Sequence, residues 1–156
     1  MVELVVVVPC FNEGRRLRAE GFRPLVDNER TCVLFVDDGS SDDTQRVLAE
    51  ICAQLGPRAS CLVLPQNRGK GEAVRQGMLA GLQMGAQIVA FLDADLATPA
   101  EEMLRLVATL RASRDAPLPR PRLRDGRLDD SRAAGVRHPV RRQGILRLEA
   151  AGCCAR

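Results

Sequence analysis

Four short apolar runs alternate with longer amphipathic stretches over the first 110 residues of the chain. The runs contain many β-branched residues and few polar ones, which is the pattern of strands buried on both faces. They occupy residues 4–8, 31–36, 61–64 and 88–92. Helical segments between such strands imply β-α-β crossovers. We therefore predict an α/β fold with a mostly parallel sheet flanked by helices.

Three of the intervening segments carry helix signals. Residues 47–55 place apolar side chains at helical spacing behind Ser41, which we expect to cap the first free amides of the helix. Residues 98–101 combine a capping box with a proline at the first helical position, ahead of an apolar face over residues 103–110. Residues 70–85 form the third predicted helix. It carries a stripe of small residues that permits close packing on a sheet: Ala73, Gly77 and Gly81.

Polar clusters follow the first, second and fourth predicted strands, at residues 9–13, 37–43 and 93–95. In parallel sheets, ligands bind beyond the carboxyl ends of the strands, so the three clusters predict one shared site. The last cluster places Asp93 and Asp95 two residues apart, on the same side of an extended chain. Two such carboxylates suit Mg²⁺ or Mn²⁺ that also holds a diphosphate. A solvated loop after a buried strand is the simpler explanation for an isolated Asp-x-Asp.

Two further segments offer groups for a nucleotide. The Asp37 carboxylate can accept hydrogen bonds from a ribose hydroxyl or a base N–H, although an N-cap rich in Ser and Asp also explains residues 37–43. Residues 67–71 combine the cations Arg68 and Lys70 with two glycines before a helix, where backbone amides and the Lys70 ammonium group can meet a diphosphate. Gly71 stands where a Walker loop needs Ser or Thr, and Val74 breaks the dinucleotide fingerprint. Both departures argue against an ATPase and a dehydrogenase.

Composition narrows the classes further. Aromatic residues make up only 3% of the chain, which argues against base stacking and against a nucleic-acid partner. The longest apolar run near the start is too short for a membrane span or a signal peptide.

Six cysteines without zinc spacing predict free thiols in a cytoplasmic setting, and we expect the thiol of Cys10 to be passive. We expect Cys32, Cys52 and Cys61 to act as small core residues. A single histidine, His138, argues against a Ser-His-Asp site.

The character of the chain changes at residue 113. The net charge is +3, yet more than half of the arginines lie from Arg111 onward, and prolines interrupt the same region. Such sequence cannot easily bury a core. We therefore predict a folded unit over residues 1–112 and a poorly ordered Arg/Pro-rich tail over 113–156. A shifted reading frame, a truncation or a divergent lineage would each produce this change, and an anchor to anionic lipid headgroups is a functional alternative.

Four ordered motifs resemble the family 2 glycosyltransferases over roughly residues 2–110. Residues 5–13 (VVVVPCFNE) resemble the family's V-P-x-[YF]-N-E opening, and residues 36–42 (VDDGSSD) resemble its V-D-D-G-S-x-D segment. Residues 67–78 resemble N-x-G-K-G-x-A-V-R-x-G-M, and residues 91–99 match the D-A-D-L-x-T-P region. The residues of the last two motifs are most similar to those of the dolichyl- or polyprenyl-phosphate glucosyltransferase branch, with the mannosyltransferase branch second.

The resemblance implies a GT-A fold, truncated or divergent at the C-terminus, whose nucleotide-sugar half is present. It implies no assigned catalytic base, and a metal site for Mg²⁺ or Mn²⁺ at Asp93 and Asp95. The matched nucleotide-sugar-binding positions are Pro9, Phe11, Glu13, Asp37, Arg68, Lys70 and Asp93.

The implied activity is inverting transfer of a hexose, glucose from UDP-glucose, to a dolichyl or polyprenyl phosphate at the cytoplasmic face of a membrane. A mannosyltransferase using GDP-mannose and a non-catalytic nucleotide-sugar-binding module or fragment remain alternatives. A sugar-nucleotide pyrophosphorylase would carry a G-x-G-T-R-like loop where residues 9–13 stand, so it is disfavoured. An exposed sheet edge, left where the missing part should pack, further predicts a homodimer or aggregation. Peripheral membrane contact is a separate expectation.

Overall fold

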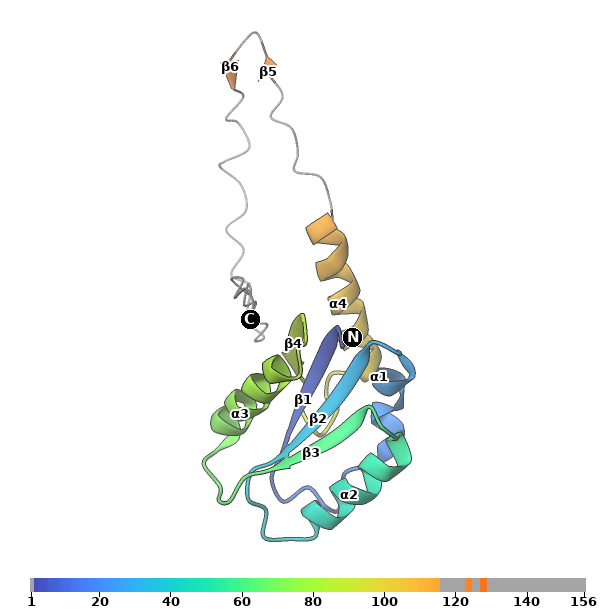
Figure 1. Ribbon diagram of the computed structural model, residues 1–156, viewed down its shortest axis with the longest axis vertical. Coiled ribbons are helices and arrows are strands. Elements are labelled where there is room, and N and C mark those ends of the chain that lie inside the picture. The colour runs from blue at the N-terminus through green and yellow to red at the C-terminus, as the bar shows by residue number, and fades with distance from the viewer. Residues whose placement is uncertain (1, 116–122, 125–126, 129–156) are drawn as a thin grey trace, which may run out of the picture.

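Four parallel strands form the main sheet of the computed structural model, which describes residues 2–115, 123–124 and 127–128 (Figure 1). The strands are β1 (Leu4–Cys10), β2 (Thr31–Asp37), β3 (Ala59–Val63) and β4 (Ile88–Phe91), in the order β3-β2-β1-β4. The predicted α/β architecture and all four strands are thereby confirmed. A separate antiparallel pair joins β5 (Leu123–Arg124) to β6 (Arg127–Leu128).

Helices cover both faces of the sheet (Figure 1). They are the 3₁₀-helix η1 (Ala19–Phe22), α1 (Arg23–Asp27), α2 (Thr44–Leu55), α3 (Lys70–Gln83) and α4 (Ala100–Asp115). Alternate residues of each strand point to opposite faces. Val6, Val8 and Phe35 therefore join the core beneath α1, α2 and α4, whereas Val5, Val7 and Val36 pack against α3. Three layers result, with the sheet in the middle.

The small-residue stripe of α3 packs directly on the sheet, as predicted. Ala73, Gly77 and Gly81 are the buried residues of this helix. A Cβ at Gly77 would collide with Val7 and lie 2.9 Å from Val36 Cγ2, so only glycine permits this approach. Met78 is partly buried against the same core, whereas Leu79 and Leu82 are exposed. The backbone of α3 therefore lies close to β1 and β2.

Pro9 marks the point at which the sheet opens. Pairing of β1 with β4 ends at Val7 and Phe91, where Val7 O accepts the Leu92 amide. Two residues on, Pro9 still pairs with Val36 of β2. By the strand's period of two, its nitrogen faces the side where β4 has already ended, so its missing N–H removes no ladder bond. A crevice begins there, where the strand order reverses on either side of β1.

Some expectations need correction. Residues 19–27 form η1 and α1, which the sequence patterns did not indicate, and Cys61 is exposed rather than in the core. Ser41 does not cap α2, because the N-cap position is occupied by Asp43 and the Ser41 hydroxyl donates to Asn12 Oδ1 instead. The four cysteines of the described part, Cys10, Cys32, Cys52 and Cys61, are free, as expected. The helix α4 continues to Asp115, and most of the predicted tail lies outside the described residues, so the division at residue 112 stays a prediction.

None of the helices within the described residues combines the length and the apolar composition that a bilayer crossing requires.

Candidate nucleotide-sugar site

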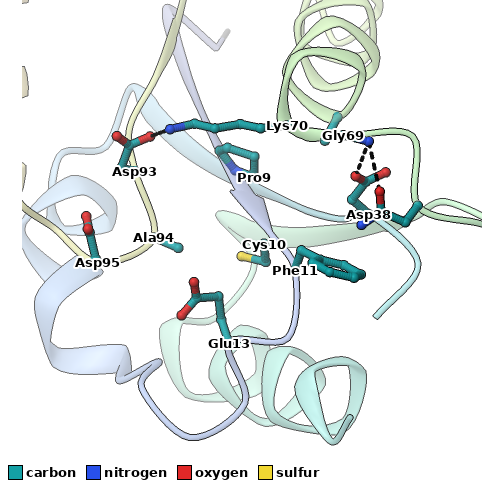
Figure 2. A pocket seen from close by; sticks show the side chains of 12 residues that line it. Pro9, Cys10, Phe11, Glu13, Asp38, Gly69, Lys70, Asp93, Ala94 and Asp95 are labelled. Carbon is teal, nitrogen blue, oxygen red and sulfur yellow. Dashed lines mark hydrogen bonds and ion pairs between the residues drawn. The ribbon is translucent and has the colours of Figure 1, made fainter. Parts of the chain in front are cut away.

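A cavity of about 340 Å³ lies beyond the carboxyl ends of β1 and β4 (Figure 2). It is the size of a small-ligand pocket and is open to solvent. Six of the eight side chains expected at a donor site line it: Pro9, Phe11, Glu13, Lys70, Asp93 and Asp95. Asp37 and Arg68 are not among the lining residues. The lining also includes residues that were not predicted to bind the donor: Cys10, Asp38, Asn67, Gly69, Ala73 and Ala94.

Asp38 holds the cationic loop in place. Its side chain is 2% exposed, and its two oxygens accept the amides of Arg68 at 3.0 Å and Gly69 at 2.8 Å. Gly69 has a φ of 92°, which L-residues with side chains rarely adopt, and α3 begins at the next residue. Asp38 therefore fixes the entry into α3 and, with it, the starting position of Lys70. The sequence offered one signal for this role, the doubled aspartate at the end of β2.

Asp37 lies beside the cavity rather than in it. It is 1% exposed, and its Oδ1 accepts the Ser40 hydroxyl at 2.5 Å and the Ser40 amide at 3.2 Å. Ser40 Oγ in turn accepts the amide of Asn12 at 2.9 Å. The carboxylate thus orders the turn after β2 and, through Ser40, the loop after β1. Its predicted contact with uracil or ribose stays a prediction.

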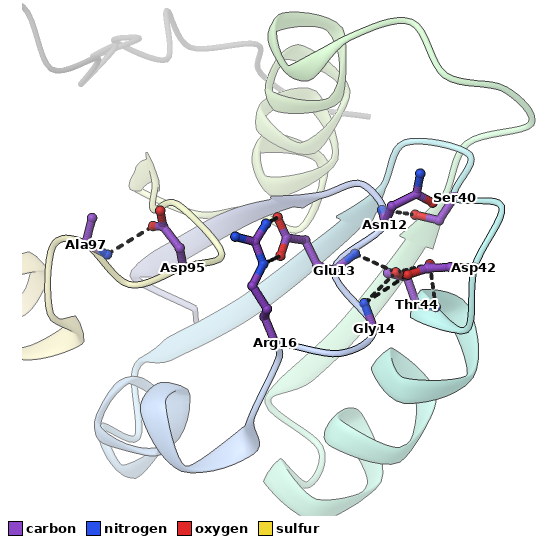
Figure 3. A network of polar contacts seen from close by, with 9 residues as sticks. All are labelled: Asn12, Glu13, Gly14, Arg16, Ser40, Asp42, Thr44, Asp95 and Ala97. Carbon is purple, nitrogen blue, oxygen red and sulfur yellow. Dashed lines mark hydrogen bonds and ion pairs between the residues drawn. The ribbon is translucent and has the colours of Figure 1, made fainter.

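A network of polar contacts joins the loop after β1 to the start of α2 (Figure 3). Thr44 Oγ1 accepts the amides of Glu13 at 2.8 Å and Gly14 at 2.9 Å. Asp42 accepts the Thr44 hydroxyl and amide and also the Gly14 amide. The Thr44 hydroxyl, followed by these amides, lowers the pKa of Asp42 below its usual value. The network fixes residues 12–14, and hence the positions of the two cavity side chains of this loop, Phe11 and Glu13.

Those two side chains differ in their environment. Phe11 is 44% exposed and presents an aromatic surface to the cavity. Glu13 is held by Arg16 through two contacts of 2.8 Å and 2.7 Å, so its charge is already compensated (Figure 3). An exposed aromatic ring is a suitable surface for stacking a nucleobase.

The loop after β4 carries the two aspartates. Asp95 Oδ1 accepts the amide of Ala97 at 3.0 Å, and Leu96 between them has a left-handed backbone with φ 53°. Asp93 Oδ1 lies 2.5 Å from Lys70 Nζ, a contact that crosses the cavity (Figure 2). The cavity is therefore bordered by two carboxylates on one side and by the first turn of α3 on the other.

The donor set fits a divalent cation that also binds a diphosphate. Within the described residues, no cluster of three or more His, Cys, Asp or Glu side chains is arranged to enclose a metal. Mg²⁺ and Mn²⁺ sites of this kind use one or two carboxylates plus substrate phosphates, so Asp93 and Asp95 suffice in number. Asp93 Oδ1 is buried beneath the Lys70 ammonium group, and no other described group donates a hydrogen bond to it.

Cys10 is the one cysteine among the residues that line the cavity. It is 2% exposed, and its thiol donates to Val8 O at 3.5 Å. Burial, reinforced by the nearby Cys61, Glu13 and Asp37, raises the pKa of Cys10 far above that of a free thiol. The expectation of a passive thiol is confirmed, and covalent catalysis by Cys10 is disfavoured.

Comparison with known families identifies this arrangement. The family described as Glycosyl transferase family 2 matches residues 5–150. The chain belongs to this family. The family 2 match includes the loop after β1, the turn after β2, the loop before α3 and the two aspartates after β4, which are the segments that form the cavity.

Two curated relatives illustrate the branch of family 2 that the chain resembles. A dolichyl-phosphate beta-glucosyltransferase of Mus musculus is 36% identical over 114 residues, which cover 67% of this chain and 34% of the relative. An undecaprenyl-phosphate 4-deoxy-4-formamido-L-arabinose transferase of Klebsiella pneumoniae is 34% identical over 107 residues, covering 66% of this chain and 32% of the relative. The chain therefore spans about a third of the length of these relatives.

Solved family 2-like structures support the GT-A fold. Glucosyl-3-phosphoglycerate synthase from Mycobacterium tuberculosis, crystallised with Mn²⁺, UDP and glucosyl-3-phosphoglycerate, is 28% identical with a TM-score of 0.53. The match covers 70% of this chain and 39% of that one. TarS of S. aureus in complex with UDP has a TM-score of 0.56 at 19% identity, covering 77% of this chain and 39% of that one, and bears on the fold alone.

Proposed function

We propose that this chain forms the donor-binding half of a family 2 enzyme that transfers glucose from UDP-glucose to a dolichyl or polyprenyl phosphate. The observation that carries the proposal is the convergence of six expected donor-site residues on one cavity at the crevice between β1 and β4. They come from three segments far apart in the sequence. A solvated loop at Asp93 and Asp95, or a flexible basic turn at Lys70, would not require such convergence.

The proposed pose follows from the character of the cavity walls. The uracil stacks near Phe11, and Pro9 forms the rigid base of the pocket beside it. The diphosphate lies between Lys70 and the two aspartates, where the amides of the first turn of α3 also face it. The relatives' names indicate lipid-phosphate acceptors, and the synthase from Mycobacterium tuberculosis was crystallised with UDP and Mn²⁺. Both findings support this pose without fixing the sugar.

Asp93 and Asp95 would hold Mg²⁺ or Mn²⁺ in this pose. Bound there, the ion supplies Lewis-acid stabilisation of the negative charge on the departing diphosphate. Lys70 adds a second positive charge on the same group. The chain's own residues thus position the donor and stabilise the leaving group.

The acceptor in this proposal needs little activation. A phosphate monoester is already anionic near neutral pH, with a second pKa of about 6. It can attack the anomeric carbon without a strong general base, which agrees with the absence of an assigned base among the matched positions. Transfer to a lipid phosphate would place the enzyme at a membrane surface, where the donor comes from the aqueous side.

Calorimetric titration tests the donor site. UDP-glucose is titrated into the protein with and without Mn²⁺, and GDP-mannose serves as the competing donor. Asp95→Ala should abolish the metal-dependent part of the binding. Asp27→Ala, which removes an exposed carboxylate at the end of α1, should not affect it. Absence of binding to a folded sample would refute the proposal.

A transfer assay then distinguishes an active glycosyltransferase from a non-catalytic binding module. Tritiated UDP-glucose and a polyprenyl phosphate in detergent should yield a labelled lipid if the chain turns over. Donor binding without labelled lipid would favour a non-catalytic nucleotide-sugar-binding module. Preferential binding of GDP-mannose would move the assignment to the mannosyltransferase branch.

A further inference from the structure

The contact between Lys70 and Asp93 crosses the proposed diphosphate position (Figure 2). Lys70 is the first residue of α3, and Asp93 lies on the loop after β4. The Nζ and Oδ1 atoms are 2.5 Å apart, and both residues line the cavity. The cation therefore occupies the carboxylate that the proposed metal would need.

This contact is an exchangeable charge pair rather than a structural one. The side chains of Lys70 and Asp93 are 61% and 44% exposed, and exposed pairs contribute little to stability. No other described group donates a hydrogen bond to Asp93 Oδ1, so Lys70 is its one polar partner in the described part of the chain. Lysine carries its charge on a flexible four-carbon stem. Its backbone is fixed by Asp38 through the preceding amides, whereas its ammonium group can swing to another anion.

Two other carboxylates around the cavity are already engaged. Glu13 is paired with Arg16, and the Asp38 oxygens accept two backbone amides. Asp95 Oδ1 accepts the Ala97 amide but forms no ion pair with the described residues. A divalent cation that arrives alone can therefore reach Asp95, but to bind Asp93 as well it must displace Lys70 and leave the ammonium group near another positive charge. A diphosphate removes this penalty, because it offers Lys70 a new anionic partner next to the same site.

We propose that Lys70 acts as an internal counter-ion that blocks Asp93 against a divalent cation until a nucleoside diphosphate draws the lysine away. The inference deepens the proposed donor-binding function and rests on it. Its consequence is cooperative binding: nucleotide raises the affinity for the cation, and the cation raises the affinity for the nucleotide by the same factor. Lys70 is then a positioning residue that determines the order of binding, in addition to its contact with the diphosphate.

The experiment measures free Mn²⁺ by electron paramagnetic resonance in titrations of the wild-type protein and its variants, with and without UDP. Lys70→Gln should bind Mn²⁺ alone about tenfold more tightly, because an adjacent positive charge has been removed. The increase in Mn²⁺ affinity on adding UDP should fall by a similar factor. A purely structural role for Lys70 would weaken both affinities instead.

Arg75→Gln is the matched control. Arg75 lies on the same helix, is 57% exposed and pairs with the carboxylate of Glu72, yet it does not line the cavity. The control removes the same charge, so it should leave both affinities unchanged. In an Asp93→Asn background, Lys70→Gln should no longer tighten Mn²⁺ binding, which would assign the effect to the pair itself.

Three outcomes would overturn the inference. If Lys70→Gln leaves the affinity for Mn²⁺ alone unchanged while UDP and Mn²⁺ still bind the wild type together, the counter-ion role fails and the proposed function stands. If UDP fails to bind the folded wild type at any Mn²⁺ concentration, the proposed function fails and the inference fails with it. An equal rise in Mn²⁺ affinity for Arg75→Gln would also contradict the role, because it would show an unspecific effect of net charge.

Discussion

Leu96 fills the space directly above Gly21, so that a Cβ at Gly21 would collide with Leu96 Cδ1. Leu96 sits in a left-handed backbone conformation, follows Asp95 and donates its amide to the carbonyl of Asp93 at 3.0 Å. Gly21 belongs to η1, which is far from Leu96 in the sequence. A gap in the packing of η1 thus receives the Leu96 side chain of the loop that carries the two aspartates.

Gly21→Ala should displace this loop. We expect a loss of about 1 kcal/mol in the free energy of unfolding, because the added methyl group overpacks the contact. We also expect a loss of Mn²⁺–UDP affinity by a few fold, because the loop that holds both carboxylates must shift. Urea unfolding and calorimetry measure the two effects. The double variant Gly21→Ala/Leu96→Ala should cost less than the sum of its single changes, and simple additivity would contradict the proposed coupling.

The same substitution at two positions of α3 should have opposite effects. Gly77→Ala forces a methyl group into Val7 and Val36 of the sheet, so we expect destabilisation of roughly 1–3 kcal/mol. Gly71→Ala adds a methyl group in open space within the helix, where alanine's higher helix propensity should stabilise by about 0.5–1 kcal/mol. Urea unfolding of both variants measures the difference. Equal effects would mean that helix propensity, rather than contact with the sheet, governs α3.

Asp38→Asn should loosen the loop before α3. An Asn side chain has one acceptor oxygen, so one of the amides of Arg68 and Gly69 would face an NH₂ donor instead. We expect a loss of about 1–3 kcal/mol in stability. Hydrogen exchange at the Gly69 amide should accelerate beyond the change in global stability. Unchanged protection of that amide would show that the turn holds itself without the carboxylate.

Acid should weaken the start of α3 through Glu72. Hydrogen bonds from Arg75, then from Gln76, lower the pKa of Glu72 from 4.5 to about 2. Because the folded-state pKa is the lower one, this contribution to stability is fully present above pH 4.5 and is lost as the pH falls toward 2. Glu72→Gln should therefore flatten the pH dependence of unfolding within that window and leave it unchanged above. Urea unfolding at a series of acidic pH values would reveal this, and parallel curves for both proteins would contradict it.

The strands were predictable because burial on both faces leaves a continuous apolar run, and their ends differ from the structure by no more than two residues. The aspartates after β4 were predictable for the same reason, since they interrupt such a run. The helix pair η1 and α1 was not, because residues 14–30 mix glycine, arginine and single apolar positions with no clear period. Phe22 and Leu25 are nevertheless fully buried there, and the Phe22 ring packs edge-on against Phe35 of β2.

The role of Asp38 was equally out of reach, for a different reason. The sequence shows two adjacent aspartates after β2, and either can accept hydrogen bonds from a ligand. Strand alternation sends one toward Ser40 and the other toward the loop before α3, and the partner of each depends on where the chain returns after β3. Local pattern indicates the end of the strand. Which aspartate binds Ser40 and which binds the loop before α3 depends on how the turn after β2 packs against that loop.

Gly77 and Gly81 also limit how this molecule can be redesigned. At Gly77 and Gly81 the backbone of α3 packs directly on valines of the sheet. At these two positions the helix therefore has no side chain that could be enlarged or shortened to move it. The distance between α3 and the sheet is set by backbone atoms, which are the same in every residue. This contact also fixes the position of Lys70. Attempts to change the accepted donor by repacking the core beneath α3 would therefore fail before they altered the cavity. Directed evolution should instead find its useful variants in the loops at residues 11–14 and 94–98.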